Sequence, residues 1–359
     1  MLHTAEIPFV SSLHGRQRRL ERGITTRDLK SAVKYGIKEK GFPDKYGVPR
    51  WRYTYGDIVY ITDATSTVEV TSWALEMPLA RVTIAEKYLV RQREASHRVA
   101  LDPRSITSHT VLLVDMSGSM NKSDMNGHRS RARGVYYNLA MEFIEARLHT
   151  LESGLFGGPN IGHTDVVSLV EMRGSPTVVF RREPMSWVLF NKFVDLADAK
   201  DAHDHGNYYP SLAQAFDLFE EVETSKKCAL AMFFFTDGKP SDYCTTYNFT
   251  PQEITANIME LVLVKCNQYR DRLTFTAFGF GKCEADFELL KGISAAAKIA
   301  GAVSTFGYSY LDEYALADIL TATTTSLTKT RSLLSCLGGN SHVGHREGRI
   351  KNEIGRAHV

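Results

Sequence analysis

The sequence predicts an α/β protein with a doubly wound, mostly parallel, six-stranded sheet, preceded by a small α+β domain. From residue 108 onward, short apolar segments alternate with longer segments of helical spacing, which is the order that builds a parallel sheet covered by helices. Residues 110–114 and 230–236 are continuous aliphatic and aromatic runs, as expected of central strands buried on both faces. The short Gly- and Pro-containing segment 173–176 predicts a hairpin that places one antiparallel strand at an edge.

The small domain is expected at residues 10–75. Thr25 and Thr26 are residues that cap helices, and Gly36 ends the helix that they would begin. Alternating apolar and polar residues then predict strands at 50–56, 57–63 and 66–74. Residues 1–60 hold twelve Lys and Arg against six Asp and Glu, although the whole chain carries a net charge of only +2.

The remaining elements follow in order. We expect a loosely packed linker without a site at residues 76–107, with a charged helix at 84–99 that ends before Pro103. The main domain is predicted at 108–335. Its further strands are expected at 165–172, 177–182, 273–278 and 302–306. Its helices are expected at 130–151, 187–196, 209–223, 251–270, 284–297 and 311–334. The polar tail 338–359 is expected to be disordered, and residues 353–359 resemble a translated sequencing adapter.

Oxygen-bearing side chains follow both central strands. Asp115, Ser117 and Ser119 stand at alternate positions directly after the first run, and Asp237 follows the second. The carboxyl ends of parallel strands meet at one edge of the sheet, where ligands bind in open α/β folds. Oxygen donors without sulfur or nitrogen suit a hard divalent cation such as Mg²⁺, or Mn²⁺.

The DxSxS pattern after one strand and the Thr-Asp-Gly pattern after another together resemble the metal-ion-dependent adhesion site of the von Willebrand factor type A family. The resemblance implies a cation on Asp115, Ser117, Ser119, Asn207 and Asp237, with one open position that a Glu or Asp of a partner protein fills. Gly206-Asn207 stands where the family has Gly-Thr, and Tyr208 is the other candidate for that position. The alternative is a degenerate site whose polar residues serve only as hydrogen-bonding groups of the loops.

A second resemblance concerns the N-terminal segment. The pattern of His14, Arg16 and the run 21–25 (ERGIT), followed by a helix and a hairpin, resembles a small uncharacterised domain that shares the fold of RelE- and BrnT-type toxins. Those toxins are ribonucleases, so the resemblance implies RNA contact through a basic stripe of His14, Arg16, Arg19 and Arg22. The competing interpretation is a solvated helix face in a structural or protein-binding module.

The function expected from the sequence is therefore that of an intracellular, non-enzymatic protein-binding module. Residues 278–282 lack the spacing of a phosphate-binding loop, and no catalytic triad motif accompanies them. His203 and His205 lack a third ligand at a spacing typical of zinc sites, and five cysteines without CxxC spacing indicate reduced thiols. No signal peptide or membrane span is expected. The alternatives are an RNA-binding or RNA-cleaving protein, and a subunit that docks onto an ATPase complex through its main domain.

Overall fold

The structure is a computed structural model. It describes residues 10–11, 16, 19, 24–43, 46–55, 58–74, 79–122, 124–125, 128–152, 164–199, 202–220, 228–242, 249–281, 283–309 and 320. The predicted helix at 311–334 and the tail therefore lie outside the described residues, apart from Leu320, which is buried.

The described N-terminal residues form a five-stranded sheet in the order β1-β5-β4-β3-β2. The strands are β1 (Val10–Ser11), β2 (Ile37–Gly41), β3 (Arg50–Tyr55), β4 (Ile58–Asp63) and β5 (Val68–Ala74). The three strands from β3 to β5 are where the alternation of the sequence predicts them. The edge strand β2 was not predicted, because its Ile-Lys-Glu-Lys-Gly sequence has no apolar face, and the structure leaves almost all of it exposed.

Helix α2 (Thr26–Tyr35) covers one face of this sheet. Thr25 forms a capping box with Asp28, in which each side chain bonds the backbone of the other residue, so the predicted start of the helix is confirmed. Leu29 and Ala32 pack against Tyr53 and Tyr60 of the sheet. The hydroxyl-rich cap and the 3–4 spacing of the apolar residues thus explain this small core.

The larger sheet confirms the predicted fold class. In the part of the chain that the structure describes it has six strands in the order β11-β10-β9-β6-β7-β8, and all pairs are parallel except β7 with β8. The strands are β6 (Ser108–Asp115), β7 (Asp165–Met172), β8 (Thr177–Pro184), β9 (Ala229–Thr236), β10 (Leu273–Phe280) and β11 (Val303–Ser309). The chain turns through residues 173–176 into the antiparallel edge, as the sequence predicts.

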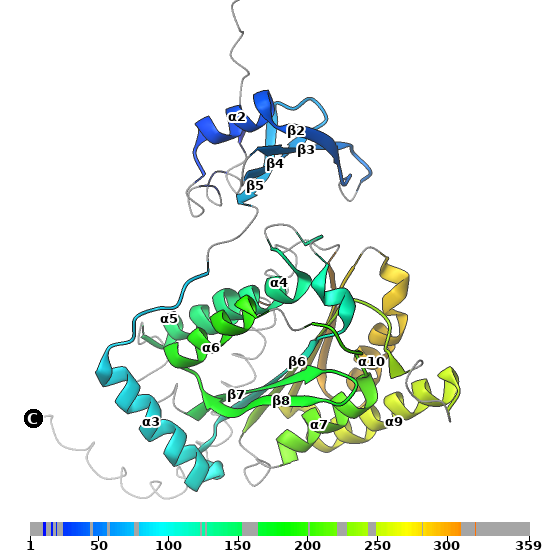
Figure 1. Ribbon diagram of the computed structural model, residues 1–359. Coiled ribbons are helices and arrows are strands. Elements are labelled where there is room, and N and C mark those ends of the chain that lie inside the picture. The colour runs from blue at the N-terminus through cyan, green and yellow to red at the C-terminus, as the bar shows by residue number, and fades with distance from the viewer. Residues whose placement is uncertain are drawn as a thin grey trace, which may run out of the picture.

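Helices cover both faces of the larger sheet (Figure 1). One layer holds α4 (Arg131–Asn138), a π-helical stretch (Leu139–Glu145), α5 (Ala146–Glu152) and α6 (Trp187–Asp198), and the other holds α7 (Tyr208–Glu220), α9 (Pro251–Tyr269) and α10 (Glu288–Ile299). Successive residues of β6 face the two layers in turn, with Val111 and Leu113 in one core and Leu112 and Val114 in the other. Because both faces are covered, β6 is buried along its whole length.

The segment between the two sheets packs more tightly than a linker was expected to. It forms α3 (Glu86–Leu101), whose Ala95 and Val99 are buried. Its Val82 backbone accepts from and donates to the Asn191 side chain of α6, at 3.0 and 2.9 Å. None of the helices in the described part of the chain combines the length and the apolar composition that crossing a membrane requires.

The capping box of α9 gives a stability prediction. The Thr250 hydroxyl accepts from Glu253 N at 3.2 Å, and the Glu253 carboxylate accepts from Thr250 N at 2.7 Å. Replacing Thr250 by Ala is expected to lower the free energy of unfolding by about 1 kcal/mol, because a helix-end N–H loses its partner. Urea denaturation measures this, with Gln252→Ala as the control, and an equal loss in the control would contradict a capping effect.

Candidate metal centre

Four of the five predicted ligands lie at one edge of the larger sheet. Asp115 is the last residue of β6, and Ser117 and Ser119 lie in the turn that follows it. Asp237 comes directly after β9, which pairs with β6 in parallel so that Val114 lies opposite Phe235. Because the two strands end at the same level, their loops begin side by side.

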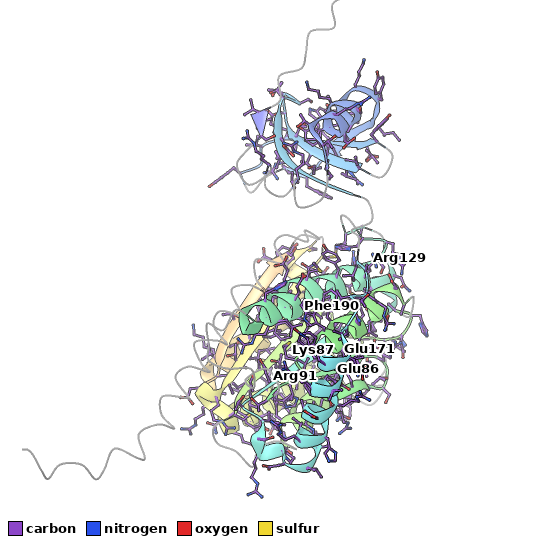
Figure 2. All side chains as sticks on the ribbon, turned by 90° about the vertical axis from the view of Figure 1, so that its left-hand side faces the viewer. Glu86, Lys87, Arg91, Arg129, Glu171 and Phe190 are labelled. Carbon is purple, nitrogen blue, oxygen red and sulfur yellow. The ribbon has the colours of Figure 1, made fainter. Side chains whose placement is uncertain are left out.

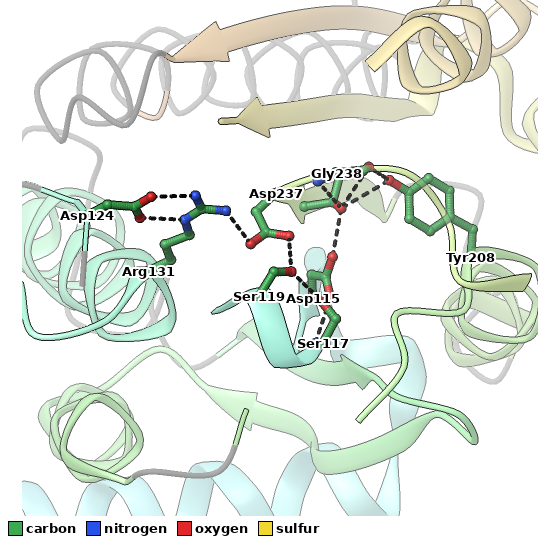
Figure 3. Close-up of polar contacts among 9 residues, drawn as sticks. Asp115, Ser117, Ser119, Asp124, Arg131, Tyr208, Asp237 and Gly238 are labelled. Carbon is green, nitrogen blue, oxygen red and sulfur yellow. Dashed lines mark hydrogen bonds and ion pairs between the residues drawn. The ribbon is translucent and has the colours of Figure 1, made fainter. Parts of the chain in front are cut away.

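Hydrogen bonds connect these four residues into one cluster (Figure 3). The Ser117 backbone N–H donates to Asp115 Oδ1 at 2.8 Å, and the Ser117 and Ser119 hydroxyls lie 2.9 Å apart. The Ser119 hydroxyl donates to Asp237 Oδ1 at 2.8 Å. The structure thus brings two carboxylates and two hydroxyls together from residues more than a hundred positions apart in the sequence.

Asp115 carries its negative charge in an unfavourable place. Its side chain is almost completely buried. Burial, and then the neighbouring Asp237 carboxylate, raise the pKa of Asp115 to about 6, against the hydrogen bonds from Ser117 and Thr236 that lower it. A site with this excess of buried negative charge is stabilised by an added positive charge.

Tyr208 is connected to Asp115 through the hydroxyl of Thr236. Its hydroxyl lies 3.0 Å from Thr236 Oγ1 and 2.6 Å from the Gly238 carbonyl, and Thr236 in turn donates to Asp115 Oδ2 at 2.7 Å. Burial raises the pKa of Tyr208 well above its usual value, so the phenol stays protonated and donates. Tyr208 therefore helps to fix the orientation of the Thr236 hydroxyl, which in turn holds the Asp115 carboxylate.

The loop before α7 approaches Asp115 closely. A Cβ atom at Gly206 would lie 2.6 Å from Asp115 Oδ1, so only glycine fits there without a shift. The neighbouring Asn207 is 6% exposed, and its amide nitrogen donates to the Gly174 carbonyl at 3.0 Å. This bond ties Asn207 to the β7–β8 turn, and the amide oxygen is the atom of this side chain whose chemistry suits a hard cation.

Two acidic residues that the sequence did not single out also shape this edge. The Asp242 carboxylate accepts from the backbone N–H groups of Tyr208 and Tyr209, at 2.5 and 3.1 Å, and so caps α7. Asp124 accepts two bonds of 2.7 Å from the Arg131 guanidinium, and the third bond of Arg131, also 2.7 Å, goes to Asp237 Oδ2. Asp242 lies 34 residues after Tyr208, and Asp237 lies 106 residues after Arg131, so no local motif indicates these contacts.

The donor chemistry of this centre fits a hard divalent cation. In the described ranges no three His, Cys, Asp or Glu side chains gather as a metal-binding group. A cation here would therefore rely on the hydroxyl oxygens of Ser117 and Ser119 and on the Asn207 amide as well as on Asp115 and Asp237. Few charged ligands and several neutral oxygens are typical of Mg²⁺ sites, which keep bound water.

The close approach of Gly206 yields a test of this geometry. Replacing Gly206 by Ala is expected to weaken Mn²⁺ binding at least tenfold, because the added methyl group displaces Asp115 Oδ1 or the loop. Calorimetric titration measures the affinity. Gly118→Ala is the matched control, since a Cβ at Gly118 meets nothing within 4 Å. Equal affinities of wild type and Gly206→Ala would show that Oδ1 is not constrained by this loop.

The sequence suggests a basic stripe for RNA contact, but this stripe is not exposed at Arg19. Arg19 is 8% exposed, its Nε lies 3.5 Å from the buried Glu69, and it donates to Thr26 at 2.6 Å. Arg16 is exposed, whereas His14 and Arg22 lie outside the described residues. Arg19 thus serves the core of the small domain, and the resemblance to RelE- and BrnT-type toxins stays a prediction.

The similarities of this chain to known proteins are found among solved structures. No family model matches the sequence, and no curated protein matches it. Similar solved structures include a von Willebrand factor type A protein from Catenulispora acidiphila, with 16% identity over 78% of this chain and 46% of that chain and a TM-score of 0.40. The PilB minor pilin from Streptococcus sanguinis has 10% identity over 83% of this chain and 78% of that chain, with a TM-score of 0.47.

A third similar structure is proximal thread matrix protein 1 from the mussel byssus with a zinc-occupied MIDAS motif, with 12% identity, 62% of this chain and 48% of that chain covered and a TM-score of 0.39. This chain spans about half the length of the Catenulispora and mussel proteins. The fold assignment rests on the strand order and helix layers of this chain itself.

Proposed function

We propose that this chain is a non-enzymatic protein-interaction module that binds Mg²⁺ or Mn²⁺ at Asp115, Ser117, Ser119, Asn207 and Asp237. The observation that carries the proposal is the hydrogen-bonded cluster of Asp115, Ser117, Ser119 and Asp237 at the carboxyl edge of the sheet. The bound cation captures a Glu or Asp side chain of a partner protein.

The charges of the site support this function. Two buried aspartates, one of which also pairs with Arg131, only partly neutralise a divalent cation, and the remaining ligands are neutral oxygens, so the cation keeps affinity for one more carboxylate. A site built of carboxylate and hydroxyl oxygens is suited to binding a cation and, through it, a partner protein.

The first experiment is a calorimetric titration of Mg²⁺ and of Mn²⁺ into the full chain after treatment with a chelator. Saturable binding to one site is expected, with affinity lost again when chelator is added. A chain that takes up neither cation would contradict the proposed function.

Recognition of an acidic partner is tested with a peptide that carries one Glu and with its twin that carries Gln instead. Mn²⁺ on the protein accelerates the relaxation of water protons through its bound water. The Glu peptide is expected to reduce this enhancement, because its carboxylate replaces a bound water, whereas the Gln peptide leaves it unchanged. Identical effects of the two peptides would contradict carboxylate capture while leaving cation binding intact.

A further inference from the structure

We propose that Arg131 is a resident counter-cation that limits the affinity of the centre for divalent cations, and that Asp124 moderates this effect. The inference rests on the proposed function, and it assigns roles to two residues outside the predicted ligand set. Arg131 is the first residue of α4, Asp124 lies in the loop before this helix, and both are next to the cluster (Figure 3).

Arg131 is buried between two carboxylates. Its side chain is 6% exposed, and those of Asp237 and Asp124 are 2% and 23% exposed. The planar guanidinium binds both oxygens of Asp124 through Nε and Nη2, and Nη1 binds Asp237 Oδ2. The guanidinium keeps its charge at any physiological pH, so it is a permanent positive charge beside a predicted ligand.

The Asp237 carboxylate is shared between two neighbours. Its Oδ1 accepts from Ser119 in the cluster, and its Oδ2 binds Arg131. A divalent cation at the cluster is repelled by the guanidinium and competes with it for the charge of the same carboxylate. In a buried site such interactions are weakly screened. Arg131 therefore lowers the attraction of the centre for the cation.

Asp124 acts in the opposite direction. Its two bonds neutralise much of the Arg131 charge, so the guanidinium acts less strongly on Asp237 than it would alone. The surrounding loop holds this arrangement in place, because Arg131 N–H donates to the Lys122 carbonyl at 3.1 Å and the Ser130 hydroxyl accepts from Arg133 N at 3.1 Å. Removing either charged side chain should thus change cation affinity, with opposite signs.

The test measures Mn²⁺ affinity by calorimetry on the full chain and its variants. Arg131→Gln is expected to bind Mn²⁺ at least about tenfold more tightly than wild type, and Asp124→Asn at least about threefold more weakly. Arg131→Lys keeps the charge and is expected to stay close to wild type. Arg133→Gln is the matched control, because it removes a buried guanidinium from the same helix that pairs with Asp198 instead.

Thermal unfolding gives a second readout. Without Arg131 the Asp237 charge is left with less compensation, so Arg131→Gln is expected to have a lower Tm than wild type in chelator. Added Mn²⁺ should then raise the Tm of Arg131→Gln by more than it raises that of wild type, because ligand stabilisation grows with affinity. A purely structural role predicts a lower Tm without this larger recovery.

The outcomes separate this inference from the proposed function. Wild-type binding with equal or weaker affinity in folded Arg131→Gln would overturn the role of Arg131. Binding by Arg131→Gln and not by wild type would support that role while contradicting cation binding by the natural chain. Absence of binding in every variant would overturn both. Should Arg131→Gln not fold, Asp124→Asn decides, because unchanged or tighter binding there overturns the inference.

Discussion

Replacing Asp115 by Asn is expected to reduce Mn²⁺ affinity at least about a hundredfold and to remove carboxylate-peptide binding with it. The substitution keeps the shape of the side chain and removes one of the two charges of the cluster. Asp115 accepts from the Ser117 N–H and from the Thr236 hydroxyl; the oxygen of an Asn side chain can accept from Ser117 N–H, and its amide nitrogen can donate to the Thr236 oxygen. The loss would therefore report the charge of the ligand, with the sheet still folded.

The control for this prediction is Asp217→Asn, which removes an exposed carboxylate of α7 far from the edge where β6 ends. Calorimetry on both variants, with circular dichroism to confirm folding, measures the difference. Capture of the Glu peptide by Asp115→Asn without a cation would contradict the adhesion-site mechanism, since the partner would then bind through other groups.

The larger sheet was predictable because each of its strands carries its own signal. Uninterrupted apolar runs such as 230–236 arise where both faces of a strand are buried, and β9 (Ala229–Thr236) is buried along its whole length. The edge strand β2 and the packing of α3 were not predictable in the same way. β2 has no apolar face to mark it, and the segment before α3 is held by a residue far along the chain, Asn191.

The predicted ligands were readable for a similar reason. Asp115, Ser117 and Ser119 are close in sequence, and Asp237 directly follows a continuous apolar run that predicts a strand. A pattern of residue types therefore identifies all four. Arg131 and Asp124 carry no such signal, because a basic residue in the first turn of a helix and an acid in a polar loop are common. Only the folded chain brings their charges to Asp237.

Arg19 shows the same limit in the small domain. Its spacing with Arg16 suggests one basic face, yet it pairs with Glu69, fifty residues later. Charge spacing along a helix says which side chains can share a face. It does not say whether that face meets solvent or a buried carboxylate from another strand.

The charge of Asp115 is also expected to affect stability. The same charge that strengthens cation binding should destabilise the cation-free chain. Its pKa in the folded chain is about 6, above that of an Asp in an unfolded chain, because of burial and the nearby Asp237. Between about pH 4 and 6 the folded chain holds a proton that the unfolded chain has released. The contribution of Asp115 to stability therefore falls as pH rises through this interval, and its full cost remains above pH 6.

Asn cannot ionise, so Asp115→Asn is expected to be more stable than wild type at pH 7.5 in chelator, by on the order of 1–3 kcal/mol. The difference should shrink as pH is lowered and vanish below about pH 4, where Asp115 is protonated in both states. Thermal melts at pH 4, 5, 6 and 7.5 measure this, with Asp217→Asn as the control. Saturating Mn²⁺ should then stabilise wild type and leave Asp115→Asn unchanged, because the buried charge that destabilises the free chain is the charge that holds the cation. A variant less stable than wild type at pH 7.5 would mean that Arg131 already compensates both aspartates.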